Sequence, residues 1–203
     1  MEYSRERVAG MLFFAAVTQF ILGLAIAEAL YPGFSLSSQY ISDLGTGPSA
    51  IVFNSSVFIL GLLLAVGTYF LRQIPELKTL SILLFLMAIA AMGVGVFTSH
   101  FTIPHCAAAS AAFFFSGLSA IVSAKVLKKP LSLIGIILGA MTIAALGLYS
   151  AGIITSGSLT SNIAYDSDFY LGLGPGGMEH MVVYPALMWL AWFSGHLATQ
   201  REK

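Results

Sequence analysis

The chain has 203 residues, of which 58% are hydrophobic and only 9% are charged, and its formal net charge is zero. Soluble domains contain about 25% charged residues, so this composition and a mean hydropathy of +0.89 exclude an ordinary soluble domain and indicate a membrane protein. The balanced charge offers no basic patch, which excludes a nucleic-acid partner. The single cysteine, Cys106, excludes an intrachain disulfide and a CxxC metal or redox motif.

Six apolar stretches are long enough to cross a bilayer, whose hydrocarbon core takes about 20 residues of helix. They lie at residues 8–30, 50–71, 80–98, 104–125, 131–154 and 178–197. Helices are expected because backbone polar groups in lipid must be satisfied internally, and no alternating barrel pattern occurs. The first stretch lacks a convincing cleavage motif and is expected to be a helix. The sequence therefore predicts an all-α fold, a six-transmembrane-helix bundle forming a single integral membrane domain over residues 1–203.

The positive charges fall only in alternate gaps between these stretches. The nine cations are Arg5, Arg7, Arg72, Lys78, Lys125, Lys128, Lys129, Arg201 and Lys203. Cytoplasmic loops of membrane proteins carry an excess of Lys and Arg. The pattern therefore predicts a multi-pass protein of the cell membrane with both termini cytoplasmic and three outward-facing segments.

The polar residues that could carry chemistry gather on the predicted outer side. They are Glu28, Ser42, Asp43, His100, His105, Glu179 and His180. Side chains from several helix ends at one level can converge, as a metal or acid–base site requires. Histidines with a carboxylate suit Zn²⁺, which would also activate a bound water. His100, His105 and His180 are the candidate metal ligands, and Glu28, Ser42, Asp43 and Glu179 are the candidate catalytic groups.

A structural role is the alternative for the same residues. They lie at helix ends, where headgroup water reduces the cost of a charge, and the sequence has no HExxH or HxxxH motif. On a regular helix the adjacent Glu179 and His180 point about 100° apart, so they would share a centre only at a frayed helix start. Asp43 can cap a turn through its side chain instead of taking part in catalysis.

Several segments resemble prokaryotic membrane proteins catalogued as domain of unknown function 998. They are Ala27–Gly33, Ile41–Gly45, Phe53-Asn54, His105 and Gly174–Pro185. The resemblance covers nearly the whole chain in order and implies six helices. It implies no reaction, because that family is functionally uncharacterised.

A weaker similarity is to the membrane hydrolase superfamily that contains alkaline ceramidases, which use a Ser, an Asp and three His around zinc. Residues of the same types are Ser42, Asp43, His100, His105 and His180. The chain departs from that pattern because it has six predicted spans instead of seven and lacks the HxxxH pair in the last helix.

Two classes of function remain open on this evidence. The leading hypothesis is an outward-facing enzyme, with or without a bound metal such as zinc, that acts on a lipid or lipid-linked substrate. The alternative is a non-enzymatic membrane component, either an accessory subunit of a membrane complex or a small-solute transporter. Haem ligation by His105 and His180 is a third idea.

Overall fold

The computed structural model of the protein describes residues 4–158 and 165–199. These residues form six helices that are long and apolar enough to cross a membrane, which confirms the predicted all-α membrane fold. The six are α1 (Arg5–Leu30), α2 (Ala50–Leu71), α3 (Lys78–Val96), α4 (Thr102–Ser123), α5 (Leu131–Ser156) and α7 (Gly174–Ala198). Three short 3-10 helices join them: η1 (Ile41–Gly45), η2 (Pro75–Leu77) and η3 (Asp168–Tyr170).

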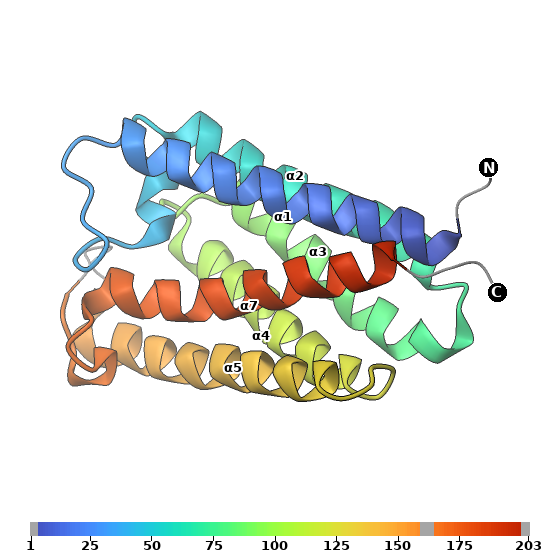
Figure 1. Ribbon diagram of the computed structural model, residues 1–203. Coiled ribbons are helices and arrows are strands. Elements are labelled where there is room, and N and C mark those ends of the chain that lie inside the picture. The colour runs from blue at the N-terminus through green and yellow to red at the C-terminus, as the bar shows by residue number, and fades with distance from the viewer. Residues whose placement is uncertain (1–3, 159–164, 200–203) are drawn as a thin grey trace.

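The helices form a closed ring in chain order. Each long helix packs against the next one, and α7 also packs against α1 to close the bundle. Figure 1 shows that α1 begins and α7 ends at the same end of the bundle. The connections containing η1 and η3 lie together at the opposite end, which we call the η1 end.

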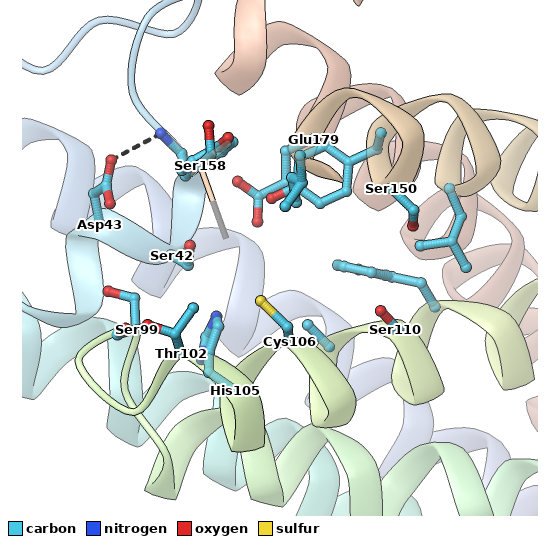
Figure 2. Close-up of a pocket in the computed structure, with 16 residues that line it drawn as sticks. Ser42, Asp43, Ser99, Thr102, His105, Cys106, Ser110, Ser150, Ser158 and Glu179 are labelled. Carbon is cyan, nitrogen blue, oxygen red and sulfur yellow. Dashed lines mark hydrogen bonds between the residues drawn. The ribbon is translucent and has the colours of Figure 1, made fainter. Parts of the chain in front are cut away.

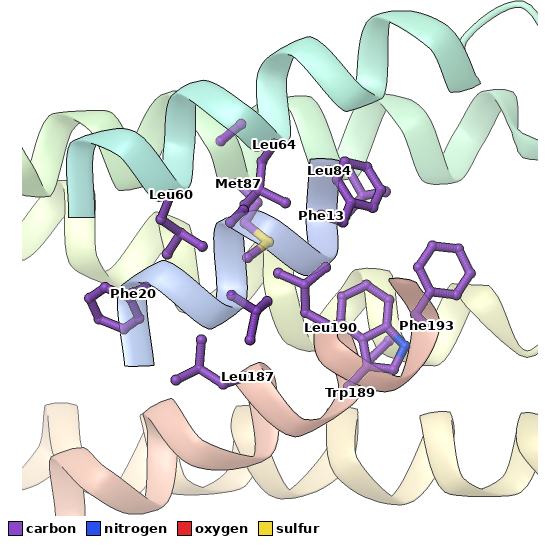
Figure 3. Close-up of a cluster of buried hydrophobic side chains, with 14 of the residues drawn as sticks. Phe13, Phe20, Leu60, Leu64, Leu84, Met87, Leu187, Trp189, Leu190 and Phe193 are labelled. Carbon is purple, nitrogen blue, oxygen red and sulfur yellow. The ribbon is translucent and has the colours of Figure 1, made fainter. Parts of the chain in front are cut away.

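The core of the bundle is apolar and lies mainly between α1, α2, α3 and α7. Phe13, Leu64, Leu84 and Phe193 are fully enclosed there (Figure 3). Many other large apolar side chains, such as Met188, are exposed on the outside of the bundle. An apolar exterior of this kind is what a protein surrounded by lipid tails requires.

Close packing of α4 against α5 depends on glycine. A Cβ atom at Gly139 would lie 2.5 Å from the carbonyl oxygen of Gly117, whereas a Cβ at Gly147, also on α5, would meet nothing within 4 Å. Small residues at a helix interface allow the two backbones to approach closely. Gly139 is therefore required for close packing of α5 against α4, whereas Gly147 is not.

We expect Gly139→Ala to destabilise the protein by about 1–3 kcal/mol, the usual cost of overpacking, because the new methyl group must push α4 away from α5. Gly147→Ala is the matched control and should leave stability unchanged or slightly raised. Thermal unfolding in detergent measures both. Equal melting temperatures for the two variants would contradict this account of the interface.

The orientation in the membrane gives a second prediction. In a Cys106→Ala background, we expect a cysteine at Ser37 to react with a membrane-impermeant thiol reagent in intact cells, because Ser37 is exposed at the η1 end. A cysteine at Lys128, exposed at the opposite end, should react only after lysis. Labelling of the Lys128 position in intact cells would reverse the predicted topology.

Candidate functional site

The first connection at the η1 end is locked in place by short polar contacts. The Tyr40 N–H donates to the Asp43 carboxylate (2.9 Å), which caps the N-terminus of η1. The Asn54 amide donates to the Gly45 carbonyl (2.9 Å) and so ties the other end of η1 to α2. The structural alternative for Asp43, a turn cap, is confirmed. Burial raises the pKa of Asp43 above its ordinary value, and the Tyr40 hydrogen bond offsets only part of that effect.

The connection between α1 and α2 packs against the glycine-rich start of α7. The Gly176 N–H donates to the Ser37 carbonyl (3.0 Å), and a Cβ at Gly176 would collide with the Gln39 carbonyl oxygen. Gly174 has a φ of +74°, which other residues rarely adopt. Helix α7 therefore begins at Gly174 and not at residue 178, where the apolar pattern begins, and Glu179 and His180 lie in its second turn.

The Glu179 carboxyl group is buried where α7 meets η1. Its side chain is only 5% exposed, and its Oε2 atom accepts a hydrogen bond from the Ile41 N–H (2.6 Å). Within residues 4–158 and 165–199, no Lys or Arg forms an ion pair with it. Ionisable side chains inside a membrane bundle are costly and are functional candidates by default.

His105, in the first turns of α4, is buried near this carboxyl group. Its Nδ1 atom lies 2.7 Å from the Phe97 carbonyl oxygen, which can only accept a hydrogen bond, so Nδ1 carries the proton. The Nε2 atom of the neutral ring is then an acceptor. Figure 2 shows His105 and Cys106 from α4 on one wall of a pocket and Glu179 on the facing wall.

This polar pocket offers about 70 Å³ to water-sized molecules, which is enough for a few waters. Its polar lining consists of Tyr40, Ser42, Asp43, Ser99, Thr102, His105, Cys106, Ser110, Tyr149, Ser150, Ser158 and Glu179. An apolar cavity of about 80 Å³ adjoins it toward the middle of the bundle, with Leu60, Met87 and Leu187 in its wall. Both are lined by Ser42, His105, Ala109, Phe113 and Glu179. The polar pocket and the apolar cavity are therefore adjacent and share part of their walls.

His180 contributes to a different contact. Its Nδ1 lies 2.7 Å from the Gly176 carbonyl oxygen, and its Nε2 lies 3.6 Å from Glu28 Oε1. Neither Nε2 nor Oε1 has another hydrogen-bond partner, although both atoms are buried. Because Nδ1 is already a donor, a proton must lie between Nε2 and the carboxylate for the contact to be attractive. This pair joins α7 to α1 and lies outside the polar pocket.

The structure therefore divides the predicted site residues. Ser42, Asp43, His105 and Glu179 line one pocket, whereas Glu28 and His180 form a separate pair and His100 is exposed in the turn before α4. Among the described residues, no three His, Cys, Asp or Glu side chains lie close enough together to hold a metal ion. The predicted zinc ligands are not assembled, and we derive no step through a metal.

Two tyrosines, Tyr40 and Tyr149, line the pocket, and Tyr170 contacts the first of them; none was predicted as a site residue. The Tyr40 and Tyr170 hydroxyls lie 3.3 Å apart, and the Tyr40 ring packs edge-on against Tyr149 (5.8 Å between centroids). Burial raises the pKa of Tyr40 and of Tyr170 above the ordinary value for tyrosine, so both remain neutral hydrogen-bond donors. Tyr149 and Ser150 are polar neighbours within an apolar helix, but the sequence does not show that they face the pocket.

Comparison with known proteins identifies a family for the chain. A family model described as "Protein of unknown function (DUF998)" matches residues 14–196. The chain belongs to the DUF998 family. No curated protein and no solved structure matches it. DUF998 membership agrees with the resemblance noted in the sequence and brings no reaction with it, so a function has to be argued from the pocket.

We expect Asp43→Ala to lower stability by about 1 kcal/mol, the usual cost of losing a capping acceptor, because the Tyr40 N–H loses its partner. Asp43→Asn keeps an acceptor oxygen and should unfold at nearly the temperature of the original protein. Thermal unfolding in detergent measures both variants. An equal loss in Asp43→Asn would show that the charge matters and that capping is not the role of this residue.

Proposed function

We propose that this protein is an outward-facing membrane enzyme that hydrolyses or transfers an ester-type bond of a lipid or lipid-linked substrate. Glu179 and His105 are its proton-transfer groups. The observation that carries the proposal is that a buried carboxyl group without a cation and a histidine with a free Nε2 line one pocket that adjoins an apolar cavity. The distribution of Lys and Arg supports an outward opening in the cell membrane with cytoplasmic termini.

The pairing of the two spaces supports a lipid as the substrate. The polar pocket suits a headgroup, because hydroxyl side chains make up much of its lining. The apolar cavity suits the first part of a hydrocarbon chain, since aliphatic side chains from α2, α3 and α7 line it. His105 and Glu179 border both spaces, so the bond that joins headgroup and chain would lie beside them.

The local contacts suit the two groups to different roles in general acid–base catalysis. The Nε2 of His105 accepts the proton of an attacking water, and the Phe97 carbonyl holds the ring and favours the imidazolium that forms. The water oxygen bonds to the ester carbon or phosphorus, and the bond to the leaving oxygen breaks. Glu179, in its protonated form, gives its proton to that oxygen, and the proton on His105 then returns to Glu179. The neutral Tyr40 hydroxyl can donate to the developing negative charge.

The proposal predicts the effect of Glu179→Gln and His105→Gln on lipid turnover. Each variant should slow turnover by about 10²–10⁴-fold, the usual contribution of a positioned acid or base. Glutamine keeps an oxygen that can accept from the Ile41 N–H, so Glu179→Gln should still fold. Purified protein incubated with a total membrane lipid extract, with products identified by mass spectrometry, gives the measurement.

Glu28→Gln is the matched control, because Glu28 is also a carboxylate near the η1 end but lies outside the pocket. It should retain turnover while changing stability through its contact with His180. Unchanged turnover in Glu179→Gln would remove the residue from the site. If the original protein turns over no lipid, then stable co-purification with a partner would favour the accessory-subunit alternative. Solute flux into vesicles that contain the protein would favour a transporter.

A further inference from the structure

A second hollow lies between α2 and α3 at the end of the bundle opposite the polar pocket. It is a groove that offers about 380 Å³ to water-sized molecules. Helix α2 contributes Ala65 and Tyr69 to it, Arg72 follows directly after the last residue of α2, and α3 contributes Lys78, Ile82 and Phe85. The residues from each helix are spaced three or four positions apart, which places them on one helix face. The groove thus runs along the two helix axes and shares no residue with the proposed active site.

The groove has one charged end and one apolar end. Arg72 and Lys78 lie where the α2–α3 hairpin turns, and the wall toward the middle of the bundle is made of apolar side chains. Ile82 is 54% exposed and Phe85 is 47% exposed, so this wall is open to the surrounding lipid. Three hydroxyl groups line the groove, on Thr68, Tyr69 and Ser81, and those of Thr68 and Ser81 donate to carbonyl groups of the preceding turn. Arg72 and Lys78 are the charged donors that the groove offers to a ligand.

The two cations have no acidic neighbour in the groove, because Glu76, which lies between them in sequence, is exposed and does not line it. Neither Arg72 nor Lys78 forms an ion pair with a carboxylate among the described residues, and no acidic residue lines the groove. The Arg72 guanidinium packs over the Tyr69 ring, 4.3 Å from its centroid. Stacking on an aromatic ring orients a guanidinium without using its hydrogen bonds. The groove thus presents two unpaired cations, one of them held in position.

We propose that this groove binds an anionic phospholipid of the leaflet on that side. The phosphate lies between Arg72 and Lys78, and one acyl chain follows the apolar wall past Ile82 and Phe85. Arginine and lysine are the usual partners of phosphate, and basic pockets between membrane helices bind acidic headgroups. A soluble phosphate compound would leave the apolar wall without a partner, so the occupant is a lipid.

Lipid binding to the purified full chain in nonionic detergent tests this site. Native mass spectrometry would compare phosphatidylglycerol with phosphatidylcholine of the same chain length. The original protein should retain phosphatidylglycerol in preference to phosphatidylcholine. Arg72→Gln/Lys78→Gln should weaken phosphatidylglycerol binding by about 10–30-fold, as expected for two cations near the membrane surface.

Lys128→Gln/Lys129→Gln is the matched control, because it removes the same charge from the same end of the bundle and leaves the groove intact. It should bind phosphatidylglycerol as the original protein does. An equal loss in the two double variants would show general attraction to the anionic surface and would overturn a specific site.

A further variant tests the apolar half of the groove without changing charge. Ala65→Phe fills the groove and should also reduce retention of phosphatidylglycerol, whereas glycerol phosphate, which has no chains, should not compete with the lipid. Competition by glycerol phosphate, or full lipid retention in Ala65→Phe, would overturn the proposal. Thermal unfolding of every variant shows whether the fold is kept. None of these outcomes depends on Glu179 or His105.

Discussion

The confinement of positive charge to one end of the bundle shapes the chemistry of the η1 end. Every Lys and Arg that the structure describes lies at the opposite end, so a carboxyl group near η1 has no strong cation within reach. Burial of an unpaired carboxylate costs several kcal/mol, and the protein meets this cost in two ways. Glu179 accepts a hydrogen bond from the Ile41 N–H, whereas Glu28 faces the imidazole of His180. No cation therefore stabilises the ionised form of the Glu179 carboxyl group.

The hydrogen bond between Glu179 and Ile41 also joins two distant parts of the chain. It fixes η1, which Asp43 and Asn54 already hold as a rigid turn, against the second turn of α7. The glycines at the start of α7 permit this approach, because a side chain at Gly176 would displace the backbone of the first connection. Hydrogen bonds to backbone groups therefore position η1 beside α7, and the Glu179 carboxyl group has both a structural and a chemical function in the proposal.

Much of the fold could be predicted from hydropathy alone, because each membrane-crossing helix must be apolar over about 20 residues. The start of α7 could not, since its Gly-Pro-Gly-Gly sequence is typical of a loop, whereas in the structure it is helical and the first connection packs on it. That extension is why Glu179 and His180 lie on a regular helix and face different neighbours. Histidines and carboxylates predicted at one membrane level suggested a metal ligand set, but the direction of each side chain decides whether three ligands converge.

The sequence predicted some residues of the candidate site and missed others. Ser42, Asp43, His105 and Glu179 were placed at one level by the charge pattern, and the structure brings them to one pocket. Tyr149 and Cys106 were missed because each lies among apolar residues in a spanning helix, where sequence gives no sign of which face turns inward. The same limit applies to the groove beside Arg72. Its cations were read as topology signals, and only the packing of α2 on α3 shows that they border a hollow.

The two hollows have opposite polarity for a physical reason. At the η1 end the available groups are hydroxyls, backbone amides, histidines and carboxyls, which can exchange protons but attract no anion strongly. At the other end the groups are a guanidinium and an ammonium, which attract phosphate but do not readily exchange protons near neutral pH. A lipid phosphate would therefore be held at the cationic end without reaction, and bond cleavage is expected only at the η1 end. The charge distribution from which the orientation in the membrane is predicted would thus also separate the proposed lipid binding from the proposed chemistry.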